Sequence, residues 1–466
     1  MNTPEQLNPL IVKGPAAHRV YQREEHNKAA IPFELVSLQA MGIVEARVVA
    51  EDSPSPWQYM GVSEGDTFIG TINSIEIGKY RLDFRVGGES ALTYCSIEPV
   101  FVGDLWILAG QSNMEGCGQL VDVDQPEVGI SCFYMSDRWD VAHDPLCWPN
   151  ESVDPVHWRI AEVDLPLAIR QERRDRAKGA GLGIPFAKEL RKHMNIPIGL
   201  IMCAHGGTSM AQWDPALADL AGCSLYGAML RKIKKLGGKV KGCLWYQGEG
   251  ETFEDSAPLY VERMKNWVAN LRHDIGDPEL PFIYAQLSVF FVLEPDERWP
   301  YPDLWDQIQQ DQLALESHIS NSAMVPTIDA KLADAIHVDT SSLRAIGRRM
   351  AWQALKLAYK QPVCHPGPRP VHFSWNQDRS ELVISLAGIN GKLSAVDKVF
   401  GFRVGKGGQI FGHLATLTED RQKIRIVFEQ TVPAESQLQH GAGFNPTVNV
   451  KDGMGIPLVV FGPITL

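Results

Sequence analysis

The sequence predicts an α/β protein built around a parallel sheet, with a β-rich unit on either side. Short apolar runs alternate with amphipathic stretches from about residue 103 to residue 361, which is the pattern of a parallel sheet covered by helices on both faces. Before residue 100 and after residue 362, short β-type runs separated by turn residues replace this alternation. A length of 466 residues suits two to four such units.

The flanks and the centre define three predicted domains. We expect an N-terminal β-sandwich-like domain over residues 1–100, an α/β domain over residues 101–361 and a C-terminal β domain over residues 362–466. The proline-rich stretch Cys364-His365-Pro366-Gly367-Pro368 is expected to link the last two. The β-type runs of the flanks are Gly42–Ala50, Thr67–Ile77, Lys79–Val86, Leu382–Leu386, Val399–Val404 and Lys423–Phe428.

The centre alternates expected strands with expected helices. The apolar runs that predict strands are Leu105–Ala109, Ile198–Ala204, Val240–Tyr246, Phe282–Leu287 and Met324–Ile328. The amphipathic stretches that predict helices are Ile184–Met194, Tyr226–Leu236, Leu259–Ile275, Leu304–Ile319 and Ser341–Tyr359. A long polar segment from about Gln119 to Gly181 breaks the alternation. An insertion of this length inside a compact domain is usually a functional lid or wall.

The composition argues against several classes of partner. A net charge of −12 disfavours nucleic acid and anionic membrane surfaces, and no run of about 20 apolar residues could span a bilayer. The first residues lack a basic region followed by an apolar core, so no signal peptide is visible. This predicts a cytoplasmic protein, or a periplasmic or secreted one if a leader has been removed. Neither a metal nor another cofactor is expected.

The cysteines leave the compartment open. Cys203 and Cys243 lie inside apolar runs, as small buried residues do. Cys132 and Cys147 flank a loop-like stretch and could pair in an oxidising compartment. No Cys-x-x-Cys pattern supports a thiolate zinc site.

Ser112 is the most informative residue of the chain. It follows the apolar run Leu105–Ala109 in Gly110-Gln111-Ser112-Asn113-Met114. An apolar run that ends in glycine predicts a buried strand and then a tight turn, and open α/β sheets bind ligands outside the carboxyl ends of their strands. A Ser-Asn pair after a strand can also merely cap a helix, so the interpretation of Ser112 depends on the other strand ends.

Three further segments follow expected strands and offer what a serine nucleophile needs. His205-Gly206-Gly207-Thr208-Ser209 brings two glycines, which let the backbone approach a ligand and expose amide N–H groups. Trp245-Tyr246-Gln247-Gly248-Glu249 brings an amide side chain, and Asp334-Ala335-Ile336-His337 brings a base and its orienting acid. Each segment is a weak signal alone, but all of them fall at one edge of the sheet, where a shared cleft must lie.

These four segments, in this order, resemble the four blocks of the carbohydrate acetylesterase branch of the SGNH hydrolase superfamily. More closely, the chain resembles the sialate O-acetylesterase family. Tyr21-Gln22-Arg23, Gly103-Asp104 and Gly401-Phe402 fit this resemblance outside the blocks. The resemblance implies a three-layer α/β/α catalytic domain and a hydrolase that removes acetyl groups from sugar hydroxyls. The implied partner is an O-acetylated carbohydrate.

Carried over residue by residue, the resemblance implies a serine mechanism. Ser112 would be the nucleophile, His337 the general base and Asp334 its orienting acid. The backbone N–H groups of Ser112 and Gly207 and the side-chain amide of Gln247 would form the oxyanion hole. The candidate substrate-binding residues are Asn113, His205, Trp213 and Glu249. Glu115-Gly116 after Met114, and His205 before Gly-Gly-Thr, depart from the family pattern, which leaves the identity of the sugar open.

Rival interpretations remain at this point. Asp334, His337, Asp339 and His205 could form a metal site, although no His-Glu-x-x-His pattern supports one. Glu249 and Glu251 could be the acids of a glycosidase, but they lie too close in the sequence to flank a bond. A non-catalytic carbohydrate-binding protein could use its loop tryptophans, which are Trp139, Trp148, Trp158, Trp213 and Trp299.

A sialate substrate would need a cation near the pocket to bind its carboxylate. The insertion offers four candidates, which are Arg138, Arg159, Arg170 and Arg173. Most arginines are exposed and solvated, so the sequence favours that role for each of them. Acetylated sialic acid, acetylated xylan fragments and other acetylated sugars all remain open as substrates.

Overall fold

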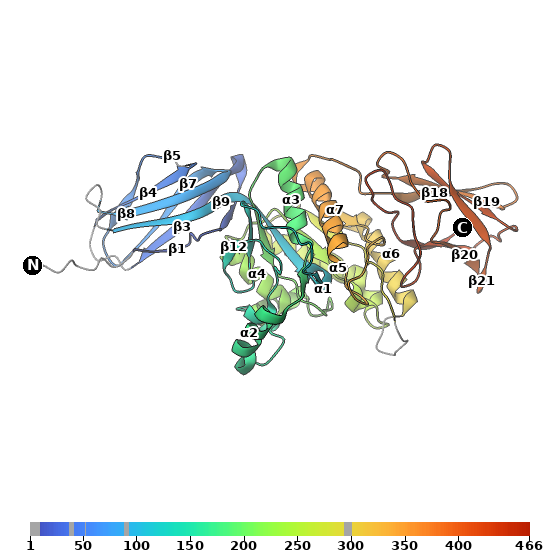
Figure 1. Ribbon diagram of the computed structural model, residues 1–466, viewed down its shortest axis with the longest axis horizontal. Coiled ribbons are helices and arrows are strands. Elements are labelled where there is room, and N and C mark those ends of the chain that lie inside the picture. Colours follow the sequence, from blue (N-terminus) through green and yellow to red (C-terminus); the bar gives the residue numbers. More distant parts are fainter. Residues whose placement is uncertain (1–9, 37–41, 52, 88–92, 293–300) are drawn as a thin grey trace, which may run out of the picture.

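The computed structural model describes residues 10–36, 42–51, 53–87, 93–292 and 301–466. Three regions follow one another along the long axis of the molecule (Figure 1). A β-rich region carries the N-terminus, an α/β region lies in the middle, and a second β-rich region carries the C-terminus. The mixed α/β fold predicted from the alternation of apolar and amphipathic runs is confirmed.

The N-terminal region consists of two packed sheets. Its strands are β1 (Ile11–Lys13), β2 (Val20–Gln22), β3 (Lys28–Val36), β4 (Gly42–Ala50), β5 (Ser53–Pro54), β6 (Gln58–Ser63), β7 (Thr67–Glu76) and β8 (Gly78–Val86). One sheet has the order β1-β3-β7, while β4, β6 and β8 belong to the other. Alternating side chains of β3, such as Ile31 and Phe33, are buried against Leu82 and Phe84 of β8. This alternation is typical of strands with one face on a core.

Strand β9 (Thr93–Gly110) connects the first two regions without a break. Its first half pairs with β8, and its second half lies between β14 (Ile198–Met202) and β15 (Gly242–Tyr246) in the central sheet. The expected boundary at residues 100 and 101 therefore falls inside one continuous strand. Because the strand is shared, the N-terminal sheet is continuous with the strand that ends at Gly110, two residues before Ser112.

The central sheet has the order β12-β11-β14-β9-β15-β16-β17. All neighbours are parallel except β12 at the edge. The remaining strands are β11 (Ile130–Phe133), β12 (Trp139–Val141), β16 (Phe282–Ala285) and β17 (Ser322–Val325). The longer helices are α2 (Leu165–Asp175), α3 (Gly183–Met194), α4 (Leu225–Lys235), α5 (Tyr260–Ile275), α6 (Pro302–His318) and α7 (Thr340–Tyr359).

Two tryptophans of adjacent strands show that helices cover both faces of the sheet. Trp106 of β9 packs edge-on against Phe186 of α3, on the face where α3 and α7 lie side by side (Figure 1). Trp245 of β15 points to the opposite face and packs against Trp267 of α5, with ring centroids 4.4 Å apart. This three-layer arrangement leaves the carboxyl edge of the sheet open, as the sequence predicted.

The insertion after the nucleophile turn is more regular than expected. It was expected to be a lid or wall, but it also adds β11 and β12 to the edge of the central sheet and carries α2. Its two ends pair as a short antiparallel ladder of β10 (Gly118–Gln119) and β13 (Lys178–Ala180). The signal for β11 was weak because its four buried residues include a serine. Such a short run does not stand out as a strand.

The C-terminal region also contains two sheets. Their orders are β18-β19-β23-β22 and β21-β20-β24-β25. The strands are β18 (Arg369–Trp375), β19 (Glu381–Ala387), β20 (Phe402–Lys406), β21 (Gln409–Ile410), β22 (His413–Leu417), β23 (Lys423–Phe428), β24 (Gln437–His440) and β25 (Phe461–Thr465). Arg369 joins this region to α6 through a bidentate ion pair with Glu316, at 2.8 and 2.9 Å. Of the helices described, none is both long and apolar enough to cross a membrane.

Asp104 connects β9, the segment after β2 and the end of α7. Its carboxylate is fully buried and accepts hydrogen bonds from Gln22 (2.9 Å), from Nε and Nη2 of Arg23 (both 2.9 Å) and from the Tyr359 hydroxyl (2.8 Å). Removing one partner of a buried ion pair leaves an uncompensated charge in the interior. The Gln22-Arg23 and Gly103-Asp104 segments singled out in the sequence therefore meet at one buried cluster.

We expect Asp104→Ala to destabilise the protein strongly. The Arg23 guanidinium, which is 11 % exposed, would lose its carboxylate, and breaking a buried pair typically costs about 3–5 kcal/mol. The apparent Tm, measured by differential scanning calorimetry, should fall by about 3–5 °C. Lys13→Met, which removes an exposed ion pair with Glu34 in the same region, should change the Tm little. An unchanged Tm for Asp104→Ala would show that this cluster does not stabilise the fold.

Candidate active site

The nucleophile turn begins where β9 ends. Gly110 has φ +131°, and a Cβ on it would lie 2.3 Å from the carbonyl oxygen of Tyr246, so only glycine fits between β9 and β15. Gln111 follows, and Ser112 opens the single helical turn α1 (Ser112–Glu115). Ser112 is 9 % exposed. The strand end therefore presents Ser112 at the carboxyl edge of the sheet, as the sequence predicted.

The Gly206-Gly207 turn after β14 lies directly beside Ser112. The amide of His205 donates to the Gly110 carbonyl at 3.0 Å, which fixes the start of the turn. A Cβ on Gly206 would lie 3.3 Å from the Ser112 Cβ. Gly207 has φ +73°, is exposed, and has open space where a Cβ would point. Within the described ranges, no acceptor bonds the backbone N–H of Gly207 or of Ser112.

A buried carboxylate holds this turn in place. Glu115 is almost completely buried and accepts the Gly206 N–H at 2.7 Å. Nη2 of Arg159, which comes from the insertion, donates to both oxygens of Glu115 at 2.6 and 2.7 Å. Glu115 was noted in the sequence only as a departure from the family pattern. In the structure it couples the nucleophile turn, the glycine turn and the insertion.

Of the four arginines considered for binding a carboxylate, Arg159 lies beside the nucleophile turn. Its Nη2 would be 3.4 Å from a Cβ on Gly206. Among the other candidates for binding a carboxylate, Arg138 and Arg173 line a separate pocket. Arg170 lies exposed on α2. The sequence could not distinguish the four arginines as candidates for binding a carboxylate. In the structure, Arg159 is the one of these four that lies close to Ser112.

His337 and Asp334 form a hydrogen-bonded pair within one loop. Nδ1 of His337 lies 2.8 Å from Oδ2 of Asp334. Oδ1 of Asp334 accepts the backbone N–H groups of Ile336 (3.0 Å) and His337 (2.8 Å). A proton on Nδ1, shared with the carboxylate, leaves the lone pair on Nε2 free to act as a base. The Asp-x-x-His spacing places acid and base in contact, as expected.

A second contact explains the ionisation of Asp334. Lys178 of β13 donates from Nζ to Oδ2 of Asp334 at 2.5 Å. Partial burial acts to raise the pKa of Asp334, but the hydrogen bonds from Lys178, from the Ile336 amide and from His337 outweigh it and lower the pKa far below its usual value. The carboxylate therefore stays charged, as an acid that orients a histidine must. Lys178 was not singled out in the sequence, where an isolated lysine carries no signal.

Asn113 joins the nucleophile turn to the histidine loop. It is fully buried, its Nδ2 donates to Oε1 of Glu249 at 2.7 Å, and its Oδ1 accepts the Val338 N–H at 3.0 Å. Ser112 precedes Asn113 and His337 precedes Val338 in the sequence. The hydrogen bond between Asn113 and Val338 therefore brings the nucleophile turn next to the histidine loop. Burial raises the pKa of the Glu249 carboxyl. Asn113 and Glu249 were expected to bind substrate, but their buried contacts fix three loops relative to one another.

Gln247 and Trp213 lie behind the glycine turn. Gln247 is fully buried, and its Nε2 donates to the Thr208 carbonyl and to Oε1 of Glu251, both at 3.3 Å. Trp213 is also fully buried, and its Nε1 donates to the Thr208 hydroxyl at 3.0 Å. The expectations that Gln247 donates to an oxyanion and that Trp213 binds sugar are therefore not met in this arrangement. A buried ring offers no face to a sugar, and the amide N–H groups already have acceptors.

His205 faces another histidine that the sequence did not connect with it. Its Nδ1 lies 3.2 Å from Nδ1 of His157, a buried residue of the insertion. Burial lowers the pKa of both histidines. Neutral rings can share one proton between the two nitrogens, whereas two charged rings would repel. His205, which was expected to bind substrate, thus lies at the base of the glycine turn.

The residues considered for a metal site and for a glycosidase do not form a compact site in the structure. Asp339 caps α7 by accepting the Ser342 N–H at 2.7 Å. Glu251 accepts the Met210 N–H at 2.6 Å and pairs with Arg263. Within the described part of the chain, no cluster of three or more His, Cys, Asp or Glu side chains is arranged to hold a metal ion. Cys132 and Cys147, which could have paired, are both free thiols.

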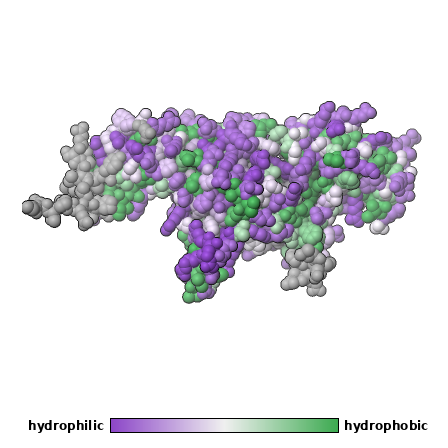
Figure 2. All heavy atoms as spheres, viewed as in Figure 1, coloured by the Kyte–Doolittle hydropathy of each residue, from purple (hydrophilic) through white to green (hydrophobic). Residues whose placement is uncertain are grey.

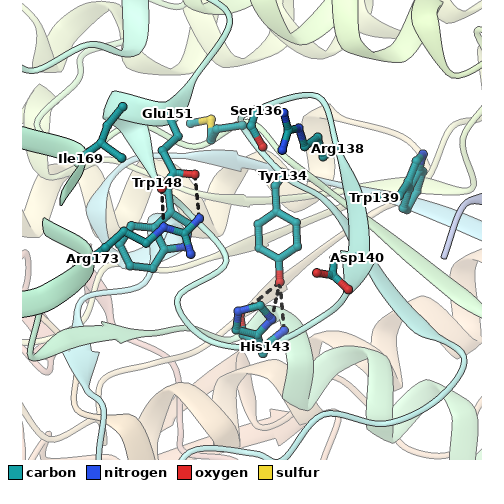
Figure 3. A pocket seen from close by; sticks show the side chains of 11 residues that line it. Tyr134, Ser136, Arg138, Trp139, Asp140, His143, Trp148, Glu151, Ile169 and Arg173 are labelled. Carbon is teal, nitrogen blue, oxygen red and sulfur yellow. Dashed lines mark hydrogen bonds and ion pairs between the residues drawn. The ribbon is translucent and has the colours of Figure 1, made fainter. Parts of the chain in front are cut away.

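A separate pocket of about 520 Å³ opens beside the carboxyl end of β11. Figure 3 shows Trp148 and the ion pair between Arg173 and Glu151 on the left, and Tyr134 hydrogen-bonded to His143 in the middle. The Arg173 guanidinium lies 4.5 Å from the centre of the Trp148 ring. Of the loop tryptophans considered as a sugar platform, Trp139 and Trp148 line this pocket, while Trp299 lies outside the described residues. Neither Ser112 nor His337 lines it.

A family model matches the central part of the chain. The model of the family described as carbohydrate esterase, sialic acid-specific acetylesterase, matches residues 102–356. The chain belongs to this family. The resemblance inferred from the four sequence segments is therefore confirmed, and the chain is a carbohydrate esterase of the acetylesterase group.

Similar proteins come from plants, animals and bacteria. A probable carbohydrate esterase of Arabidopsis thaliana is 29 % identical over 272 residues, which cover 54 % of this chain and 90 % of that protein. Human sialate O-acetylesterase is 22 % identical over 317 residues, which cover 59 % of this chain and 57 % of the human protein. The crystal structure of a carbohydrate acetylesterase from Xanthomonas citri has a TM-score of 0.67 and 19 % identity, and the match covers 96 % of this chain and 97 % of that chain. The last likeness extends the shared fold to both β-rich flanks.

Proposed function

We propose that this family member removes acetyl groups from sugar hydroxyls through an acyl-enzyme on Ser112. The observation that carries the proposal is the linkage of the Ser112 turn to the His337–Asp334 pair through the buried Asn113–Val338 hydrogen bond. A serine at a strand end needs an oriented base nearby to become a nucleophile. The buried bond favours such an encounter because it makes the two loops neighbours.

The mechanism follows from the roles of these groups in acyl transfer. His337 accepts the Ser112 hydroxyl proton at Nε2 as the oxygen attacks the acetyl carbonyl. Asp334 stabilises the imidazolium that forms. The sugar oxygen leaves with that proton, and a water molecule then attacks the acetyl-enzyme with His337 again acting as base. The products are acetate and the free sugar hydroxyl.

The negative charge that develops on the carbonyl oxygen needs donors. The backbone N–H groups of Ser112 and Gly207 serve this purpose in the proposal, because no acceptor among the described residues bonds them and the Gly206-Gly207 turn lies beside the Ser112 side chain. Losing one such donor typically costs about 10²–10³ in rate. Gln247 acts less directly, by holding the Thr208 carbonyl and hence the glycine turn.

Acetylated sialic acid and acetylated xylo-oligosaccharides are the substrates to compare. Arg159 beside the Ser112 turn is 44 % exposed and pairs with Glu115 through Nη2, and its remaining N–H donors favour a sugar with a carboxylate. Acetate release should be measured from both substrates at equal ester concentration. We expect at least about tenfold higher kcat/KM for acetylated sialic acid, equivalent to about 1.4 kcal/mol. Equal or reversed values would assign the enzyme to other acetylated glycans.

A serine-reactive phosphonate separates this enzyme from a non-catalytic carbohydrate-binding protein. Mass spectrometry should find the phosphonyl group on Ser112, since an activated serine reacts far faster than an ordinary one. Absence of labelling, together with sugar binding, would favour the carbohydrate-binding alternative.

A further inference from the structure

Lys178 shares a carboxylate oxygen with the proposed catalytic histidine. Its Nζ lies 2.5 Å from Oδ2 of Asp334, and Nδ1 of His337 lies 2.8 Å from the same oxygen. An ammonium on this oxygen withdraws part of the negative charge that His337 would otherwise meet. It also places a positive charge near the ring, which disfavours a second positive charge there.

The lysine is held by both ends of the insertion. β13, which carries Lys178, pairs with β10, where Gln119 lies opposite Lys178. The Gln119 side chain donates to the Ala333 carbonyl at 3.2 Å, and the Thr340 hydroxyl donates to the Gln119 carbonyl. The Asp334–His337 loop is thus contacted by this ladder just before Asp334, at Asp334 and shortly after His337. These contacts make Lys178 part of a fixed support, although its side chain is 45 % exposed.

From this geometry we propose that Lys178 is a positioning residue. It holds the Asp334 carboxylate in place and reduces the electrostatic stabilisation that this carboxylate gives to the His337 imidazolium. The inference rests on the proposed function, because it assigns His337 the role of base. The insertion then has a role other than forming a lid. The β10–β13 ladder at its two ends, through Lys178, would set the pH range in which His337 is neutral. Activity would then extend to more acidic pH than an isolated His–Asp pair allows.

The other charged groups near His337 must be considered with Lys178. Glu249, from the loop after β15, lies close enough to His337 to interact with it electrostatically, and burial raises the pKa of the Glu249 carboxyl. Cys117 lies close enough to Asp334 to interact with it electrostatically. Burial raises the pKa of the Cys117 thiol to about 12, so the thiol stays neutral. The Arg176 guanidinium donates to the Lys178 carbonyl at 2.8 Å. Of these groups, Lys178 is the cation that contacts Asp334 directly.

The test is a titration of His337 with and without the ammonium. We expect Lys178→Met to move the acid limb of the kcat/KM profile to higher pH by about half to one pH unit, the size of a screened interaction between two charged groups that share one carboxylate oxygen. Below that midpoint the rate would fall about three- to tenfold. Lys178→Arg should keep the wild-type midpoint because it retains the positive charge. Lys265→Met, which removes the exposed ion pair with Glu262 on α5, is the matched control and should not move it.

A second measurement does not depend on catalysis. The imidazole of His337 can be titrated by NMR in a Ser112→Ala background, once with Lys178 intact and once with the Lys178→Met substitution added. The variant that lacks the ammonium should show the higher midpoint. Coinciding midpoints, or a loss of activity that is uniform across pH, would overturn the role assigned to Lys178. Full turnover by Ser112→Ala would overturn the proposed mechanism instead, so the two failures can be told apart.

Discussion

Ser112→Ala is expected to abolish enzymatic release of acetate. Without the hydroxyl no acyl-enzyme can form, and the proposed oxyanion donors and bound sugar alone give only residual catalysis. In serine hydrolases this change lowers kcat by about 10⁴–10⁶. The loss should be measured with an activated acetyl ester, by coupled detection of acetate, because uncatalysed hydrolysis of such esters sets the lower limit.

The Ser112 experiment has a matched control. Ser317 lies exposed on α6, where its hydroxyl donates to the Ala314 carbonyl, and Ser317→Ala should retain wild-type kcat/KM. Both variants should melt at the wild-type temperature, because Ser112 Oγ forms no hydrogen bond among the residues described. Near-wild-type turnover by Ser112→Ala would show that the serine mechanism is incorrect.

His337→Ala is expected to be almost as damaging. The serine would lose its proton acceptor, and when nucleophile and base act as one unit, removing either costs a similar factor. We expect a loss of at least about 10³ in kcat with a KM within about threefold of wild type, since the base acts on the chemical step. Steady-state kinetics at about pH 8, where an ordinary histidine is neutral, separate the two parameters.

His273→Ala is the matched control for His337. His273 is an exposed histidine in the last turn of α5, and its loss should leave kcat unchanged. If His337→Ala kept more than about a tenth of the wild-type kcat, another group would have to accept the Ser112 proton. Deacylation would then also need a different base. The role of Asp334 as the acid that orients His337 would be incorrect as well.

The four sequence segments predicted the edge of the sheet where the candidate site lies, but not the function of every residue in them. Trp213 was interpreted as a loop tryptophan for sugar stacking, whereas it packs against Trp245 at 5.4 Å, inside the core. A polar neighbourhood in the sequence does not reveal that a ring folds back onto a strand. Gln247 was likewise placed at the correct strand end, but the direction of its amide depends on Thr208 and Glu251, which only the folded chain brings to it.

The sequence also did not predict contacts between residues that are far apart in the chain. Arg159 meets Glu115 and Lys178 meets Asp334 because the insertion folds back over the nucleophile turn. Neither arginine nor lysine shows a pattern in the sequence that selects a partner. The face of the middle region that Figure 2 shows is a mixture of hydrophilic and hydrophobic residues.

The sequence by itself determined the main alternation of strands and helices in the centre, the strand ends that precede Ser112 and Gly207, and the loop that carries His337. These features are encoded locally, since apolar periodicity, glycines in tight turns and the Asp-x-x-His spacing each involve neighbouring residues. Only the tertiary structure decided that β9 runs through two regions, that Glu115 holds the glycine turn and that Lys178 reaches Asp334. Such contacts depend on how the insertion and the sheet pack together, and that packing is set by the whole chain rather than by any one segment.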